Sequence, residues 1–96
     1  MAEKKIETKT GNIFEIAREQ WKDLIEVQIL EGKTVKESAG KAWTQVADML
    51  NETYKKDSLE IGELFYASIL YLRDNWNHGS ELVSWYNDFA ENKEER

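Results

Sequence analysis

The chain has 96 residues, of which 41% are hydrophobic and 11% aromatic, enough for one compact core and too few for two domains. It holds no Cys, no Pro and a single His, which excludes disulfides, thiolate metal sites and multi-histidine sites within one chain. With 13 Lys and Arg against 19 Asp and Glu, its formal net charge is −6.

The chain begins with a polar, lysine-rich segment, residues 1–11, which we expect to form a flexible tail or a short edge strand. Asn12 and Glu15 then have the spacing of a capping box, and Gly32 closes the segment that follows. These signals predict a helix over about 13–31. Its apolar residues recur on one face of a helical wheel: Ile13, Phe14, Ala17, Trp21, Leu24 and Ile25.

A second capping box, formed by Thr34 and Glu37, opens a segment that predicts a helix over about 35–55. This helix has one apolar stripe and a far side of mixed charge, as expected of a solvated face. Two glycines, Gly40 and Gly62, lie inside predicted helices, where each costs about 1 kcal/mol relative to Ala. Close approach of two helices, or a hinge, would explain them.

A third capping box, formed by Asp57 and Glu60, predicts a helix over about 58–77. One side of this helix is a broad apolar face, and three more apolar residues lie on nearly the opposite side: Leu59, Tyr66 and Leu70. A helix that is apolar on both sides is either central in its domain or shared with another chain. Because four helices leave little material to enclose it, we expect a homodimer whose interface contains these three residues.

Gly79 and Ser80 mark the last break, after which apolar residues at helical spacing predict a short helix over about 81–91, capped by Ser80. The four stripes need one another for burial, so we expect an all-α fold, a compact bundle or array of about four helices. The predicted organisation is one helical domain over residues 12–92, between the N-terminal tail and a charged C-terminal tail at 93–96.

The acidic residues are unevenly distributed. Residues 1–56 are neutral, whereas residues 57–96 hold three basic residues against nine acidic ones and carry the whole net charge. Two acidic stripes follow from the wheel, one on the first predicted helix and one on the third: Glu15, Glu19, Asp23 and Glu26, and Glu60, Glu63 and Asp74. Carboxylates one turn apart lie about 5–6 Å from each other, similar to successive phosphates of a nucleic-acid strand. These stripes are candidate partner-binding surfaces, and a merely solvated face is the alternative.

No catalytic or cofactor site emerges from the sequence. His78 lies at an expected helix end, where it can interact with the last carbonyl groups, and no nucleophile can be assigned to it. Nucleotide-binding and calcium-binding spacings do not occur. The four tryptophans have the spacing of core residues. We therefore expect a protein that is not an enzyme and that needs no cofactor or metal.

The segment Arg18–Thr53 resembles the first two helices of Myb-like and helix-turn-helix regulators, through Trp21, the turn at 31–34 and the pattern Trp43-x-x-Val46. That resemblance implies a DNA-binding transcriptional regulator with a basic recognition helix next. Here the next segment begins with Asp57 and Glu60 instead, and acidic residues at that place would be repelled by phosphates.

The overall profile, small, free of Cys, acidic and rich in aromatic helices, resembles the DNA-mimic and host-takeover inhibitor proteins of bacteriophages. This resemblance implies a non-catalytic acidic protein that occupies the basic nucleic-acid-binding surface of a partner, such as a histone-like nucleoid protein or the transcription machinery. It implies no direct binding of nucleic acid or membrane, and a cytoplasmic location, the host cytoplasm for a phage protein. The alternatives are the DNA-binding regulator and a small helical protein–protein adaptor.

Overall fold

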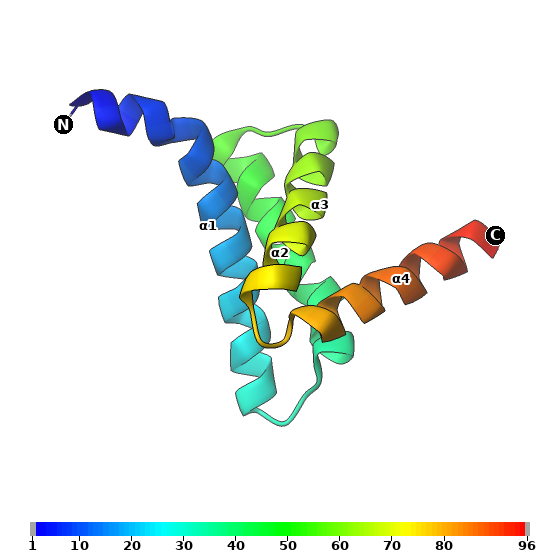
Figure 1. The fold of residues 1–96 in the computed structure, drawn as a ribbon. Coiled ribbons are helices and arrows are strands. Elements are labelled where there is room, and N and C mark those ends of the chain that lie inside the picture. Colours follow the sequence, from blue (N-terminus) through cyan, green and yellow to red (C-terminus); the bar gives the residue numbers. More distant parts are fainter. Residues whose placement is uncertain (1, 96) are drawn as a thin grey trace.

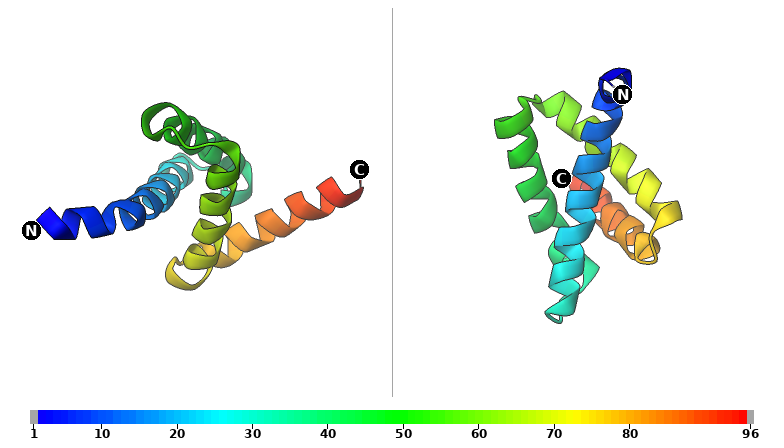
Figure 2. Two further views of the ribbon diagram at one scale, coloured as in Figure 1. Left: turned by 90° about the horizontal axis from the view of Figure 1, so that it is seen from above. Right: turned by 90° about the vertical axis from the view of Figure 1, so that its left-hand side faces the viewer.

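A computed structural model describes the backbone of residues 2–95 and the side chains of residues 13–90. It consists of four helices, α1 (Ala2–Leu30), α2 (Val35–Tyr54), α3 (Ser58–Asn75) and α4 (Gly79–Glu95). The described residues contain no strand, so the predicted all-α fold of about four helices is confirmed. Helix α2 packs against all three others, α3 lies between α1 and α4, and the chain ends point away from the core on opposite sides (Figures 1 and 2).

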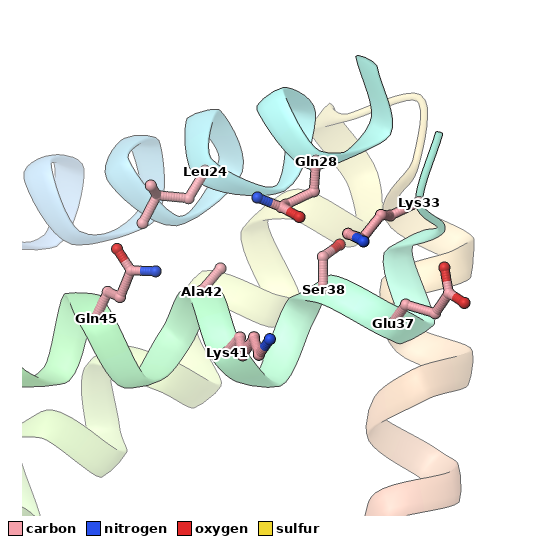
Figure 3. Close-up of a pocket in the computed structure, with 8 residues that line it drawn as sticks. All are labelled: Leu24, Gln28, Lys33, Glu37, Ser38, Lys41, Ala42 and Gln45. Carbon is pink, nitrogen blue, oxygen red and sulfur yellow. The ribbon is translucent and has the colours of Figure 1, made fainter. Parts of the chain in front are cut away.

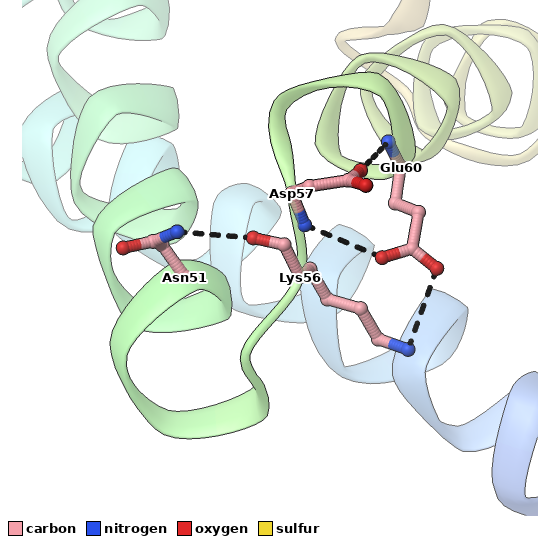
Figure 4. Close-up of polar contacts among 4 residues, drawn as sticks. All are labelled: Asn51, Lys56, Asp57 and Glu60. Atoms are coloured by element: carbon pink, nitrogen blue, oxygen red, sulfur yellow. Dashed lines mark hydrogen bonds and ion pairs between the residues drawn. The ribbon is translucent and has the colours of Figure 1, made fainter.

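Two of the predicted capping boxes form at the starts of α2 and α3. The Thr34 hydroxyl accepts from the Glu37 backbone N–H at 3.1 Å, and the Glu37 carboxylate accepts from the Thr34 N–H at 3.0 Å. Asp57 and Glu60 make the same reciprocal pair at 2.9 and 3.3 Å (Figure 4). Each box satisfies backbone donors that the first turn of a helix leaves unpaired, which explains why these two boundaries follow the sequence.

The predicted start of the first helix is wrong. Helix α1 begins at Ala2, so Asn12 does not open it and no edge strand forms there. The physical reason is that Ala, Lys and Glu are good helix formers, and extending an existing helix costs little compared with nucleating one. The tails expected at 1–11 and 93–96 involve side chains outside the described residues, and the domain limits of 12–92 stay a prediction.

The core is organised around one aromatic ring from each helix. Trp21 of α1 is fully buried, and its ring centroid lies 4.9 Å from that of Trp43 (α2), 5.3 Å from Phe65 (α3) and 6.2 Å from Trp85 (α4). The Trp21 indole N–H donates to the Ala39 carbonyl oxygen at 3.0 Å, so its polar atom is satisfied inside the core. The expectation that the tryptophans are core residues is confirmed here.

The corner between α3 and α4 differs from its prediction. Helix α4 begins at Gly79 rather than at residue 81, so Ser80 is not its cap, and it reaches Glu95 rather than residue 91. His78 lies before α4, where its carbonyl oxygen accepts from the Leu82 N–H at 3.1 Å. The ring of His78 contacts the Glu81 carboxylate at 2.7 Å, so this residue belongs to the start of α4 as much as to the end of α3.

Candidate functional site

Glu19, a member of the α1 acidic stripe, forms ion pairs within its own helix. Glu19 lies 3.3 Å from the Arg18 Nε and 3.5 Å from the Lys22 ammonium group. The Arg18 guanidinium in turn lies 3.9 Å from the ring centroid of Tyr71 in α3 and 4.8 Å from that of Phe14. Arg18 therefore joins α1 to α3 by cation–π contacts, and Glu19 is its counter-charge.

Glu26 also has a structural contact. Its carboxylate accepts a hydrogen bond of 2.9 Å from the indole N–H of Trp76, the buried residue that ends α3. The remaining two members of the stripe, Glu15 and Asp23, are exposed and make no ion pair or hydrogen bond with the residues whose side chains are described. The helical wheel placed all four together, but the packing of α3 divides them into two structural and two free carboxylates.

The α3 stripe is divided in the same way. Glu60 belongs to a capping box and lies 4.0 Å from the Lys56 ammonium group (Figure 4). Asp74 accepts two hydrogen bonds from the Arg73 guanidinium, at 3.1 and 3.2 Å, and these bonds with the adjacent positive charge hold the pKa of Asp74 below its ordinary value. Glu63 is exposed and has no such contact within the described part of the chain.

The apolar residues predicted on the second side of α3 are exposed. Leu59 is 72% exposed, Tyr66 52% and Leu70 38%. They line a shallow groove of about 480 Å³ along α3, together with Gly62 and Ala67. We call Leu59, Gly62, Tyr66 and Leu70 the α3 apolar face. The exposure of this face agrees with a binding role, and the homodimer expected from the sequence is one of the assemblies that would cover it.

The sequence reasoning missed a polar pocket between α1 and α2, of about 230 Å³ (Figure 3). It is lined by two amide side chains, two ammonium groups and four further residues: Gln28, Gln45, Lys33, Lys41, Leu24, Glu37, Ser38 and Ala42. The one available signal was Gln28, a polar residue on the apolar face of its helix. The pocket exists only where two separate helices meet, which a single-helix wheel cannot show.

The described residues contain no group of three or more side chains suited to hold a metal ion. None of the helices is both long and apolar enough to cross a membrane, as far as the described residues were searched. Among the described residues, three features are candidate binding surfaces: the stripe carboxylates without a counter-charge, the α3 apolar face and the polar pocket between α1 and α2.

Comparison with known proteins identifies a family to which the chain belongs. A family model described as "Type I Thoeris inhibitor Tad4" matches residues 1–96. No curated protein and no solved structure matches the chain. Since the family model covers the entire sequence, this acidic four-helix chain belongs to the Tad4 family of phage inhibitors that act against the type I Thoeris defence of the host.

Proposed function

We propose that this chain inhibits type I Thoeris by binding a Thoeris protein stoichiometrically, without catalysis, and that its free carboxylates contact basic side chains of that protein. The observation that supports the proposal best is that three members of the two acidic stripes are exposed and have no counter-charge among the described residues: Glu15, Asp23 and Glu63. Unpaired charge of one sign steers association toward surfaces of the opposite sign and contributes to specificity.

A nucleic-acid-binding surface is one kind of basic surface that these carboxylates could occupy. The DNA-mimic form of the hypothesis needs a regular row of free carboxylates, and in the structure Glu19 and Glu26 are engaged within the chain. Glu15 and Asp23, eight residues apart on α1, are separated by about 12 Å along the helix axis. The carboxylates therefore support contact with individual Lys and Arg residues better than replacement of a phosphate backbone.

Direct binding of DNA has less support. The helix in the place of a recognition helix, α3, holds Arg73 as its one basic residue, and that guanidinium is paired with Asp74. Its exposed side carries Glu63, which phosphates would repel. The adaptor alternative predicts binding that does not depend on the carboxylates, so it is separated from our proposal by the salt and charge experiments.

The proposal is tested by titrating the chain calorimetrically into each purified protein of a type I Thoeris system, at low and at physiological salt. We expect a complex with one of them, with affinity that falls as salt rises because screening weakens charge contacts. The triple variant Glu15→Gln, Asp23→Asn, Glu63→Gln should lower the affinity more than tenfold, which corresponds to about 1.4 kcal/mol. Circular dichroism should stay unchanged, because all three side chains are exposed.

The matched control removes three exposed carboxylates elsewhere, with the variant Glu31→Gln, Asp48→Asn, Glu52→Gln, and should bind as the parent chain does. A histone-like nucleoid protein and a DNA duplex serve as comparison titrants. Absence of a complex with every Thoeris protein would overturn the proposal. Equal losses of affinity in the test and control variants would instead show that the loss reflects the net charge of the chain and not these three positions.

A further inference from the structure

The outward side of helix α3 carries apolar side chains that are not buried in the core. Leu59, Tyr66 and Leu70 follow one another along about 16 Å of helix, at a rise of about 1.5 Å per residue. The ring of Tyr66 lies beside that of Tyr86 in α4, with ring centroids 6.3 Å apart, and Tyr66 keeps half of its surface exposed. Three exposed apolar residues in a row on one helix exceed the scattered exposure usual on protein surfaces.

Gly62 lies within this row and has no role in the packing of the chain. A Cβ atom placed there would meet no heavy atom within 4 Å, whereas one placed at Gly40 would lie 3.6 Å from the Trp85 ring. Gly40 therefore lies at the contact of α2 with α4, where an added methyl group would still have ordinary van der Waals distance. Gly62 makes α3 less stable than Ala would at this position, and no close contact within the chain requires a glycine there. What it provides is a dent in the exposed groove between Leu59 and Tyr66.

The charges beside the dent are acidic. Glu63 lines the same groove and has no counter-charge among the described residues. Of the basic groups next to this segment, Arg73 is paired with Asp74 and Lys56 with Glu60, whereas Lys55 has no ion pair with the described residues. An occupant of the groove therefore meets apolar surface along its centre and an unpaired negative charge at its edge.

We propose that the α3 apolar face docks an amphipathic helix of the inhibited Thoeris protein, with its apolar side over Gly62 and a Lys or Arg beside Glu63. This inference rests on the proposed function and specifies where its contact is made. A helix fits because a glycine lets two helix axes approach closely, and because a helix laid in a groove offers apolar residues at matching spacing. Charge complementarity selects a basic flank.

A second copy of this chain is the competing occupant, and two observations disfavour it. Each copy carries a net charge of −6, so the acidic surroundings of the two grooves would repel each other. The exposed parts of Leu59, Tyr66 and Leu70 amount to on the order of 300 Å², against about 800 Å² that each partner contributes to a stable interface. A basic partner can extend the contact over neighbouring carboxylates, whereas a second copy would place acids against acids.

The decisive variant is Gly62→Gln, which fills the dent with a helix-forming side chain and adds no apolar surface. If the glycine were merely structural, this variant would lose stability. We expect instead an unchanged or higher melting temperature, together with at least a tenfold loss of affinity for the Thoeris protein that binds the parent chain. Leu59→Gln should lower the affinity in the same direction, and Glu63→Lys should weaken binding more than Glu63→Gln does.

Two controls leave the groove intact. Gly40→Ala changes a helix glycine on α2 where the added methyl group has ordinary contact distance, and Leu30→Gln removes an exposed leucine at the end of α1. Both should bind as the parent chain does. Sedimentation of the chain alone should report a monomer of 11.3 kDa.

The outcomes separate the two proposals. If the parent chain binds a Thoeris protein and Gly62→Gln binds equally well, the docking inference is wrong and the proposed function stands. If the parent chain sediments as a dimer that Gly62→Gln dissociates, a second copy occupies the face and the inference is likewise overturned. If no Thoeris protein binds the parent chain, both proposals fail.

Discussion

Gly79 occupies a position, in the corner between α3 and α4, that a side chain cannot share. A Cβ atom there would overlap the Leu72 carbonyl oxygen and lie 2.8 Å from the Arg73 carbonyl oxygen, both part of the α3 backbone. We predict that Gly79→Ala lowers the free energy of unfolding by about 1–3 kcal/mol, the usual cost of overpacking. Urea denaturation followed by circular dichroism measures the change.

Gly62→Ala is the natural comparison for that experiment, because its methyl group would meet empty space. It should raise the free energy of unfolding by up to about 1 kcal/mol through helix propensity alone. A Gly79→Ala variant as stable as the parent chain would mean that the α3–α4 corner opens readily, and would contradict the close packing described here.

The pairing of Asp74 with Arg73 affects the titration of the Asp74 carboxyl group. Hydrogen bonds from Arg73, and then its positive charge, hold the Asp74 pKa below the ordinary value of 3.8. A lowered pKa means that the ionised pair contributes stability above the ordinary value and loses it as pH falls through the pKa of the folded state. Because both groups are exposed, this contribution is small.

An NMR titration of the Asp74 carboxyl carbon should therefore show a midpoint below 3.8, and Arg73→Gln should return the midpoint toward that value. An Asp74 midpoint at or above 3.8 in the parent chain would show that the pair does not persist in solution. In that case Asp74 would join Glu63 as a free carboxylate of α3, and the acidic surface offered to a partner would be larger.

The helix boundaries show which local signals decide the structure. Thr34 and Asp57 cap α2 and α3 where the sequence predicts it, because a capping box is complete within four residues. The start of α1 was not predicted correctly. Ala, Lys and Glu are good helix formers, so the sequence carries no signal for where this helix begins. The start of α4 at Gly79 was also not predicted, since the geometry of this corner depends on carbonyl groups of the preceding helix.

The caps give a direct test of this reading. Thr34→Ala and Asp57→Ala each remove a side chain that accepts from the first turn of a helix, and each should lower the free energy of unfolding by about 1 kcal/mol. Thr44→Ala is the control, because its exposed hydroxyl donates to the Gly40 carbonyl oxygen in the middle of α2. Its effect should stay within about 0.5 kcal/mol. Equal losses at positions 34 and 44 would contradict a capping role.

The candidate surface was predictable only in part. Wheel periodicity identified the acidic stripes and the second apolar side of α3, and the exposure of Leu59, Tyr66 and Leu70 agrees with it. Which carboxylates are free depends on contacts between distant segments, such as the hydrogen bond from Trp76 to Glu26 across 50 positions. No local pattern encodes such a contact, so the division into structural and free carboxylates required the fold.

Taken as a single body, the chain combines a rigid aromatic core with an outer surface that is acidic and, along α3, apolar. In the core, Trp21 of α1 contacts one ring from each of the other three helices. The orientation of α1 relative to α3 is therefore fixed, and so is the arrangement of their carboxylates. A preorganised surface loses little conformational entropy on binding, which suits an inhibitor that acts by occupying its target. Membership of the Tad4 family assigns that target to the Thoeris defence.

The central claim is inhibition by occupation rather than by turnover. The most direct measurement is a titration of Thoeris activity, reconstituted from purified proteins held well above the dissociation constant, with increasing amounts of this chain. Occupation predicts a linear loss of activity that is complete at one chain per binding site and independent of incubation time. Complete inhibition by a small fraction of an equivalent, deepening with time, would show turnover and contradict the claim.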